Sequence, residues 1–233
     1  MQKTKGKLIV IEGSDGAGKA TQLKLLEKYL LISNHKVNTI DFPRYYDSFY
    51  GKMVAAFLRG EFGTIKQVDP HLASLIYALD RGAAKSEMES WLNDGSFVLS
   101  NRYATSNLAH QSAKLSANKR KKFIEWDLQL EYEVNKIPKE DIVIYLYVPF
   151  KISRKLVLKK SKEVRAYAKG KKRDIHERDL EFMKKSEASY LRLVKKFPHW
   201  VKIVCVDKKG NLKTREEIHV EIKNILNKKG LIK

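Results

Sequence analysis

The sequence predicts an α/β fold in which helices flank a five-stranded parallel sheet. Three observations carry this prediction: strand-like apolar runs alternate with helical patterns along the chain, no repeat or low-complexity linker interrupts them, and the first apolar run leads through a glycine-rich loop into a helical pattern. Strands that alternate with helices are typical of a parallel sheet covered on both faces. We expect a single domain over residues 1–233.

Five short apolar segments, each bounded by turn or polar residues, are the expected strands. They lie at 7–12, 36–41, 96–100, 141–147 and 201–206. The expected helices lie at 19–33, 50–59, 70–93, 104–116, 119–135, 150–160, 176–196 and 214–228. Ligands of such folds bind at the carboxyl ends of the strands, so the residues directly after each strand are the candidates for function.

The glycine-rich stretch after the first strand, residues 13–21, reads Gly-Ser-Asp-Gly-Ala-Gly-Lys-Ala-Thr. Strand, glycine-rich loop and helix form the context that a phosphate-binding P-loop requires. Backbone N–H groups can turn inward there, the helix start adds the positive end of its dipole, and Lys19 supplies a mobile positive charge. The pattern has Ser or Thr after the lysine, whereas this chain has Ala20, with Thr21 one place later. We expect the loop to bind a nucleoside triphosphate.

Two segments between the second and third strands carry groups suited to a nucleotide. Arg44 follows the second strand directly after Pro43, which stiffens the chain, and a guanidinium is well shaped to hold a phosphate. In the next long helical pattern, Tyr77 and Arg81 are four residues apart and share a helix face. An aromatic ring beside a guanidinium suits stacking on a base and reading its edge.

The third strand is followed by residues 100–111, Ser-Asn-Arg-Tyr-Ala-Thr-Ser-Asn-Leu-Ala-His-Gln. Polar side chains therefore crowd a helix start immediately beyond a buried strand. Such a place is costly for polar groups unless a ligand or a helix cap uses them.

The segment 151–173 is strongly basic, with eleven Lys or Arg residues and a single acidic residue, Glu163. A solvated basic loop is one interpretation. The other is a lid, at about 159–176, that closes on a triphosphate.

Composition narrows the class of protein. The chain has 233 residues, 43% of them hydrophobic, and its apolar runs are far shorter than the roughly 20 residues that span a bilayer. Cys205 is the only cysteine, so no internal disulfide can form, and its apolar strand segment indicates a core position. The basic N-terminal residues lead directly into a strand. We expect a cytoplasmic enzyme that does not bind a membrane.

The formal net charge of +20 raises the alternative of a nucleic-acid-binding module. Only eleven of the 47 basic residues are arginines, and several of those follow the predicted strands. No groove-reading or RNA-binding motif is present, so we do not expect nucleic acid as a partner. Steep, salt-dependent binding to DNA or RNA would favour that alternative instead.

Together these segments resemble the thymidylate kinase family over essentially the whole chain. The resemblance rests on the order and spacing of residues 13–21, 41–44 and 77–81, of Asn-Arg-Tyr at 101–103 with Asn107, and of the basic lid. It implies that ATP gives its γ-phosphate to dTMP, with Mg²⁺, on a five-stranded parallel sheet. It also implies a homodimer.

The resemblance implies roles for individual residues. ATP would be bound by Gly13, Ser14, Asp15, Gly16, Ala17, Gly18, Lys19, Ala20, Thr21 and Arg154. The catalytic residues would be Lys19, Arg102, Asp15 and, because this P-loop has no arginine, the lid residues Arg165 and Arg173. The dTMP site would comprise Asp15, Arg44, Tyr77, Arg81, Arg102, Asn107 and His110. Mg²⁺ would be held mainly by phosphates and water, with Asp15 or Glu12.

The chain departs from the family pattern at three positions: Ala20, Asn101 in place of Asp before the Arg-Tyr pair, and His110 where Tyr is common. Two alternatives therefore stay open at this point. The first is a kinase for another pyrimidine monophosphate, since His110 could alter sugar selection. The second is a degenerate homologue that binds nucleotides with little turnover.

Overall fold

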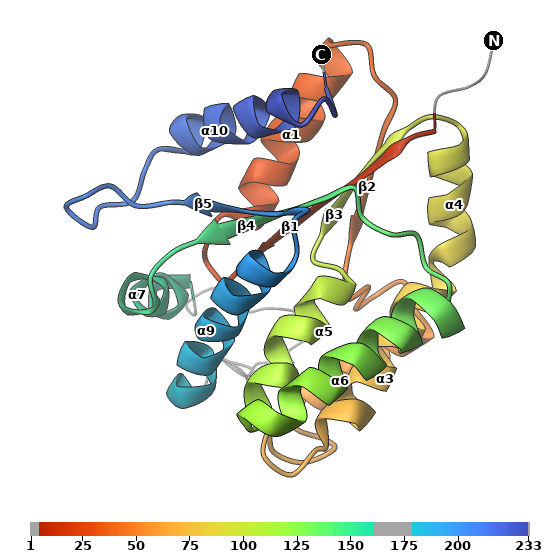
Figure 1. The fold of residues 1–233 in the computed structure, drawn as a ribbon, viewed down its shortest axis with the longest axis vertical. Coiled ribbons are helices and arrows are strands. Elements are labelled where there is room, and N and C mark those ends of the chain that lie inside the picture. The colour runs from red at the N-terminus through yellow and green to blue at the C-terminus, as the bar shows by residue number, and fades with distance from the viewer. Residues whose placement is uncertain (1–4, 161–178, 233) are drawn as a thin grey trace.

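A computed structural model describes residues 5–160 and 179–232, in which five parallel strands form one sheet in the order β2-β3-β1-β4-β5 (Figure 1). The strands are β1 (Lys7–Gly13), β2 (Val37–Asp41), β3 (Phe97–Asn101), β4 (Ile142–Tyr147) and β5 (Trp200–Val204). In this register Ile9 pairs with Leu99 on one side and with Ile142 on the other. The predicted sheet is thus confirmed, with strand ends that differ by one or two residues.

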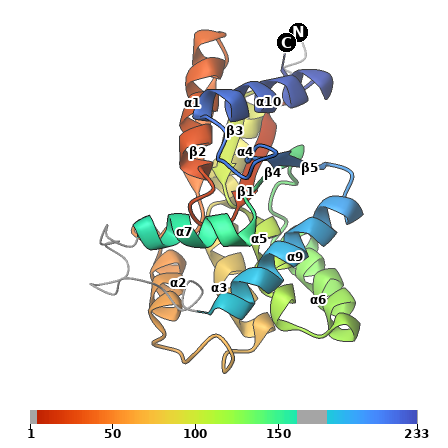
Figure 2. The ribbon, with the colours of Figure 1, turned by 90° about the vertical axis from the view of Figure 1, so that its left-hand side faces the viewer.

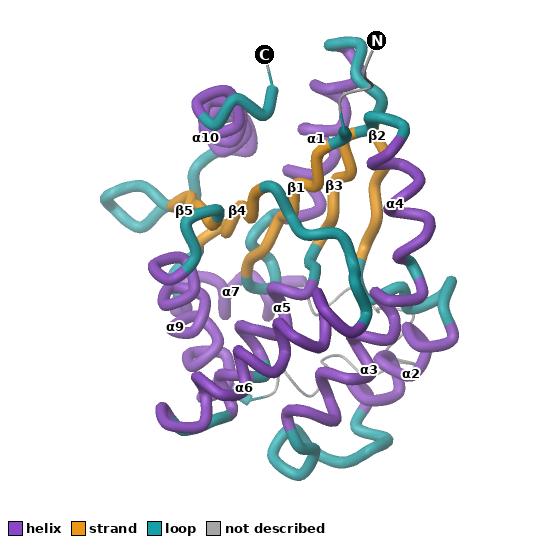
Figure 3. The backbone as a smooth tube through the Cα atoms, turned by 45° about the vertical axis from the view of Figure 1, so that its right-hand side comes forward, coloured by secondary structure: helices purple, strands orange, loops and turns teal. Residues whose placement is uncertain are grey.

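Helices cover both faces of the sheet because its central strands are apolar on both sides. Alternate residues such as Ile9 and Ile11 pack against α1 (Lys19–Ile32) and α10 (Arg215–Lys228). Their neighbours Leu8 and Val10 face the other layer. That layer consists of α4 (Lys85–Asn93), α5 (Ala104–His110), α6 (Ala117–Gln129) and α9 (Leu180–Lys196). Figure 3 shows the strands in the centre of the described chain, with helices around them.

The remaining described elements lie beyond the carboxyl ends of the strands. They are α2 (Phe49–Arg59), α3 (Pro70–Ala83), the 3₁₀ turn η1 (Ser112–Lys114), the π-helical turn η2 (Leu130–Val134) and α7 (Phe150–Lys160). Figure 2 shows α2 and α3 far from the α1 and α10 layer, with α7 crossing between them. A third buried cluster, which includes Phe57 and Ala73, joins α2 to α3.

Three predicted helices differ in the structure. The pattern of 70–93 forms two helices, because the N–H of Ala84 bonds to the carbonyl of Arg81 and closes α3. The pattern of 104–116 stops at His110, and the hydroxyl of Ser112 bonds back to the carbonyl of Leu108, an example of serine competing with the backbone ladder. The pattern of 119–135 starts at Ala117 and widens into η2, where the N–H of Asn135 bonds to the carbonyl of Leu130.

The chain leaves β1 and β3, which are neighbours, toward opposite faces of the sheet. The connection after β1 enters α1 on one face, and that after β3 enters α5 on the other. Such a divergence opens a crevice at the carboxyl ends of the two strands.

Most of the predicted lid lies outside the described residues. Within the described ranges, no helix is both long and apolar enough to cross a membrane.

Candidate active site

The glycine-rich loop joins β1 to α1 with a backbone that side chains would disturb. A Cβ on Gly13 would lie 2.8 Å from the carbonyl oxygen of Leu146 on the adjacent strand. Gly18 precedes the helix with φ of 88°, a left-handed conformation that glycine adopts without strain. No side chain caps α1, so the N–H groups of its first turn point toward the loop without an intrahelical partner. This is the backbone cradle that an anionic phosphate needs.

The side chain of Lys19 extends from α1 back toward the glycine-rich loop. Its Nζ donates to the carbonyl oxygens of Gly13, at 3.0 Å, and Ser14, at 3.1 Å, and lies 3.7 Å from Oδ1 of Asp15. The lysine side chain is only 9% exposed, whereas that of Asp15 is 34% exposed. A positive charge is therefore held at the mouth of the loop, beside a carboxylate that reaches solvent.

Arg102 brings the loop after β3 to the same point. Its backbone has φ of 66°, which is uncommon for a residue with a side chain, and its N–H bonds to the carbonyl of Ile11 on β1. Nη2 donates to Oδ1 of Asp15 at 2.8 Å, and Nη1 lies 3.3 Å from Nε2 of His110. Burial alone would lower the pKa of Arg102, but the carboxylates of Asp15 and Glu12 outweigh it and raise the pKa. The guanidinium stays charged.

Glu12 lies beneath this pair as a fully buried carboxylate. Oε1 accepts from the hydroxyls of Thr105, at 2.6 Å, and Ser106, at 2.8 Å, and Oε2 accepts from the hydroxyl of Tyr190 at 2.7 Å. The N–H of Tyr103 also donates to Oε1, at 3.3 Å. With its oxygens engaged in this way, Glu12 binds β1 to α5 and α9. The contribution of Glu12 to a metal site stays a prediction from the sequence.

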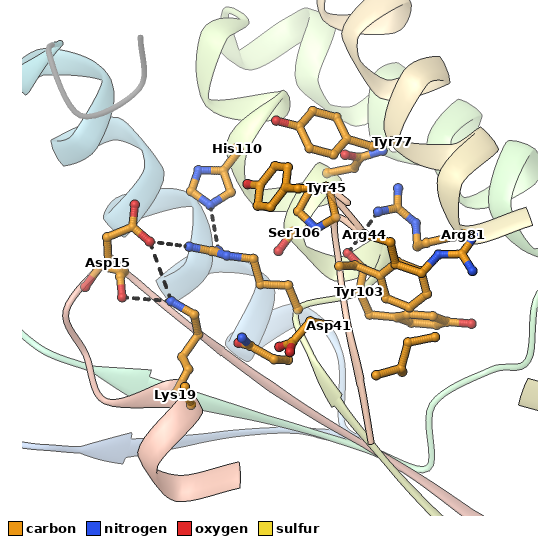
Figure 4. Close-up of a pocket in the computed structure, with 18 of the residues that line it drawn as sticks. Asp15, Lys19, Asp41, Arg44, Tyr45, Tyr77, Arg81, Tyr103, Ser106 and His110 are labelled. Carbon is orange, nitrogen blue, oxygen red and sulfur yellow. Dashed lines mark hydrogen bonds and ion pairs between the residues drawn. The ribbon is translucent and has the colours of Figure 1, made fainter. Parts of the chain in front are cut away.

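A cavity of about 870 Å³ opens above these residues, large enough for two nucleotides to meet. Figure 4 shows Asp15 and Lys19 at one end, Arg44, Tyr77 and Arg81 at the other, and His110 and Ser106 between them. The predicted site residues that line it come from β1–α1, β2–α2, α3 and β3–α5. They are Ser14, Asp15, Gly16, Gly18, Lys19, Ala20, Thr21, Arg44, Tyr77, Arg81, Arg102, Asn107 and His110.

Arg44 is held at the far end by Asp80, a buried carboxylate on α3. Oδ2 of Asp80 accepts from the backbone N–H of Arg44 at 2.9 Å, Oδ1 accepts from Nε at 3.3 Å, and the carbonyl of Asp80 accepts from Nη2 at 2.9 Å. The arginine side chain is 17% exposed, and Asp80 is 1% exposed. The guanidinium is thus fixed in direction while it remains open to the cavity.

Tyr77 and Arg81 lie one turn apart on α3, as predicted, but their surroundings differ. The ring of Tyr77 lines the cavity and meets Phe57 edge-on, with centroids 6.3 Å apart. Arg81 is almost fully buried and forms a forked ion pair with Glu131 of η2. Burial would lower the pKa of Arg81, and the charge of Glu131 raises it again. Asn107 of α5 reaches the same cluster through its amide nitrogen.

Beside Asp15, the cavity offers two neutral side-chain oxygens that could bind a metal ion. Oγ of Ser14 and Oδ1 of Asn101 are buried and have no hydrogen-bond partner in the described structure, and both residues line the cavity beside Asp15. No cluster of three or more His, Cys, Asp or Glu residues suited to a metal occurs within residues 5–160 and 179–232. One carboxylate and two neutral oxygens fit Mg²⁺, which keeps several waters and binds chiefly through phosphates.

Some predicted residues do not line the cavity. Gly13 packs against β4, and Ala17 lies in the core beneath the loop. Arg154 is exposed on α7, where the neighbouring Ser153 lines the cavity instead. Arg165 and Arg173 lie outside the described residues.

Sequence reasoning missed the groups that hold the predicted ones in place: Asp80, Glu131 and Tyr190. Asp80 lies in the motif that contains Tyr77 and Arg81. Its position between these two predicted site residues could have indicated that it belongs to the site. Glu131 and Tyr190 lie 50 and 80 residues from the side chains they contact, Arg81 and His110, and no local pattern links those pairs.

Known thymidylate kinases are similar to this chain in sequence and in fold. A sequence model of the family described as thymidylate kinase matches residues 11–218 of this chain. The thymidylate kinase of Mycobacterium tuberculosis is 33% identical over 186 residues, which cover 80% of this chain and 85% of that protein. That of Plasmodium falciparum is 33% identical over 147 residues, or 63% of this chain and 64% of that protein. A solved thymidylate kinase structure from Candida albicans shares the fold, with a TM-score of 0.72 at 21% identity over 97% of this chain and 93% of that one.

Proposed function

This chain belongs to the thymidylate kinase family, and from that premise we propose that its cavity transfers the γ-phosphate of ATP to the 5′-phosphate of dTMP, giving ADP and dTDP. It is accordingly a nucleoside monophosphate kinase. The observation that supports dTMP phosphorylation most strongly is the single cavity that joins a P-loop at one end to Arg44, Tyr77 and Arg81 at the other. Relatives named thymidylate kinase favour dTMP over another pyrimidine monophosphate.

At the donor end, the backbone N–H groups of the loop and of the first turn of α1 would surround the β- and γ-phosphates of ATP. Lys19 would exchange its carbonyl contacts for phosphate oxygens, which attract an ammonium group more strongly. Phosphoryl transfer depends on alignment and on neutralising spread negative charge, rather than on a covalent nucleophile. A preformed cradle supplies both, since its dipoles need no reorganisation during the reaction.

Arg102 would act between the two substrates. Its side chain lies between the loop of Lys19 and the residues of the acceptor end, and Asp15 and His110 hold both of its terminal nitrogens. From there the guanidinium could contact the phosphate of dTMP and the phosphoryl group in transfer. Asp15 would also face the sugar of dTMP, with His110 close by.

At the acceptor end, Arg44 would bind the 5′-phosphate of dTMP, because Asp80 already fixes the direction of its fork. The ring of Tyr77 would stack on the thymine. Arg81 and Asn107 would face the edge of the base. The lid arginines Arg165 and Arg173, and Arg154 on α7, remain predictions for contacts with ATP.

Mg²⁺ bound with ATP would neutralise phosphate charge, and Asp15 with the oxygens of Ser14 and Asn101 is the donor set that we propose for it. The protein contributes the remaining charge itself, through Lys19 and Arg102. Ala20 and Asn101 depart from the family pattern, but neither position needs a group that transfers a proton. We therefore expect turnover rather than nucleotide binding alone.

The direct test is product analysis with ATP, Mg²⁺ and dTMP, in which dTDP and ADP should form in equal amounts. The Lys19→Ala variant is the matched control, and it should lose roughly 10²–10³ in rate because one preorganised positive group is missing. Formation of ADP without dTDP, or equal rates for the wild type and the variant, would contradict the proposed function.

We also expect a homodimer, and the exposed apolar side chains of α3 support it. Leu72 is 60% exposed and Leu79 is 42% exposed, on one face of the helix with Leu75 between them. Val134 of η2 is 66% exposed. Light scattering after size-exclusion chromatography should give twice the chain mass, and Leu72→Glu should give a monomer. A monomeric wild type at micromolar concentration would refute the dimer.

Two further expectations complete the proposal. The chain would work as one kinase domain, in keeping with the family match over residues 11–218. A cytoplasmic location stays a prediction from the sequence.

A further inference from the structure

Behind the acceptor end of the cavity lies a buried cluster of ionisable and amide side chains from four elements. Arg81 comes from α3, Asn107 from α5, Asp127 from α6 and Glu131 from η2, and each is at most 2% exposed. Charged groups are seldom buried this deeply unless they are paired and hydrogen-bonded. In the proposed function Arg81 and Asn107 face the base, whereas neither of the two carboxyl groups contacts a substrate.

Glu131 fixes the direction of the Arg81 fork. Nε of Arg81 donates to both carboxylate oxygens, at 3.1 and 3.2 Å, and Nη2 makes a close contact with Oε1. Nη1 donates weakly to the carbonyl of Tyr103 at 3.4 Å. One edge of the guanidinium is therefore committed to Glu131. The N–H groups left for a ligand belong to the other edge, and Arg81 lines the cavity.

Glu131 also helps to fix which way the amide of Asn107 faces. Nδ2 of Asn107 donates to the carbonyl of Ser74 at 3.2 Å and lies 3.4 Å from Oε1 of Glu131 and 3.5 Å from Oδ1 of Asp127. The carbonyl of Ser74 and the carboxylate of Glu131 can only accept. The amide oxygen must therefore face away from these two groups, because in that place it would meet them without a donor. Asn107 lines the cavity, so its oxygen is the atom left to accept from a ligand.

We propose that Glu131 is a positioning residue that determines base specificity, by presenting an Arg81 donor and an Asn107 acceptor side by side. This inference rests on the proposed function. A donor next to an acceptor complements the 4-carbonyl and the N3–H of thymine or uracil. The same pair opposes cytosine, whose 4-amino group is a donor and whose N3 is an acceptor.

Asp127 makes the cluster electrically balanced. Burial and the nearby charge of Glu131 raise the pKa of Asp127 to about 8, although Arg81 acts in the opposite direction. At neutral pH the cluster therefore holds one guanidinium, one carboxylate and one neutral carboxyl group. Because the guanidinium of Arg81 is hydrogen-bonded to the carboxylate of Glu131, Glu131 is its counter-ion.

The position of Glu131 in η2 fits this role. A π-helical turn is rare, and such turns are often found at functional sites. The widened turn continues directly from α6, so that Asp127 and Glu131 point toward Arg81 from consecutive turns. Glu133, two residues further along the same turn, is exposed. The chain therefore offers a matched control.

The test is the Glu131→Gln variant, compared with Glu133→Gln and the wild type. A glutamine keeps the shape but loses the charge, and its amide would place donors against the donors of Arg81. We expect the KM for dTMP to rise at least tenfold and the KM for ATP to change less than twofold. The preference for dTMP over dCMP, measured as a ratio of kcat/KM values, should fall at least tenfold. Glu133→Gln should behave as the wild type.

A purely structural role for Glu131 predicts a different result: lower thermal stability, with an unchanged preference for dTMP over dCMP. That result would overturn the proposal. If Glu131→Gln does not fold, Glu131→Asp keeps the charge and shortens the side chain by one carbon. It should raise the KM for dTMP without altering that for ATP, and an unaltered KM for dTMP would again overturn the proposal. Failure of the proposed function is distinguishable, because the wild type itself would then form no dTDP.

Discussion

The guanidinium of Arg102 lies 2.8 Å from the carboxylate of Asp15, and this ion pair joins the loop after β3 to the phosphate-binding loop after β1. The two loops leave neighbouring strands, so the sheet itself sets the distance between them. The left-handed backbone of Arg102 directs its side chain to this point. Local strain of this kind is retained where the surroundings enforce it, and it is frequent at functional sites.

Removing the Arg102 guanidinium should lower kcat with dTMP. We expect kcat of Arg102→Ala to fall by roughly 10²–10³. One preorganised donor near the transferred phosphoryl group typically lowers the barrier by about 3–4 kcal/mol, and the variant lacks it. Steady-state kinetics measure this, with Arg192→Ala, an exposed arginine of α9, as the control. Near wild-type kcat in Arg102→Ala would remove Arg102 from the reaction.

The metal dependence should change when a hydroxyl is restored beside Lys19. Ala20 is exposed and lines the cavity in the first turn of α1. Ala20→Ser should lower the Mg²⁺ concentration that gives half-maximal rate, roughly threefold or more for one added oxygen ligand. Ala20→Val adds bulk without oxygen and should not lower it. The Mg²⁺ part of the proposal fails if the wild type turns over equally fast in excess EDTA.

The buried bond between Tyr190 and Glu12 should contribute to stability. The hydroxyl of Tyr190 donates to Oε2 of Glu12 at 2.7 Å, and Tyr190→Phe removes this donor. We expect the free energy of unfolding to fall by about 1–3 kcal/mol. Urea denaturation measures it. Tyr147→Phe is the control, because the Tyr147 hydroxyl also bonds to a carboxylate, that of Glu187, but in a half-buried place. Equal losses in the two variants would show that burial of Glu12 is not the cause.

The raised pKa of Asp127 predicts a pH-dependent stability difference. Folding raises that pKa from 3.8 to about 8, so between these values the folded chain keeps a proton that the unfolded chain has lost. Stability from this group is therefore present below about pH 4 and is lost as pH rises toward 8, by up to about 1.4 kcal/mol per pH unit.

Asp127→Asn removes this titration. The unfolding free energy of the variant, minus that of the wild type, should therefore increase between pH 5 and pH 8. The other groups that face Asp127 stay the same in both proteins, namely Glu131, Arg81, Ser74 and Asn107. Two parallel stability curves would contradict the assigned protonation of Asp127.

The fold could be predicted well because its signals are local. Apolar runs bounded by turn residues gave all five strands, and a glycine-rich loop between strand and helix located the phosphate site. The helix ends were harder. The break at Ala84 comes two residues after Gly82, but a single glycine within a helical pattern does not by itself fix a helix end. The π-turn at η2 likewise has no periodic signature.

The site was predictable only in part, for a related reason. Lys19, Arg44 and Arg102 lie in the segments that follow β1, β2 and β3, so the topology of the sheet brings them to one edge. The residues that orient the site come from elsewhere in the chain. Asp80 is hydrogen-bonded to Arg44, and Glu131 is paired with Arg81. Tyr190 donates to Glu12, which is 178 residues away in the sequence. Such contacts depend on tertiary packing. For Glu12, the four donors that surround its carboxylate likewise come from tertiary packing and could not be placed from the sequence.

We predict that the cavity phosphorylates a pyrimidine monophosphate with a carbonyl at position 4. The most direct measurement is a competition: ATP and Mg²⁺ with equimolar dTMP, dUMP, dCMP, dAMP and dGMP, followed by mass spectrometry of the diphosphates at low conversion. We predict dTDP as the main product, some dUDP, and at least roughly 10³-fold less dCDP, because a site built to hydrogen-bond one edge rejects the opposite pattern strongly. Comparable amounts of dCDP and dTDP, or a purine diphosphate as the main product, would contradict the account.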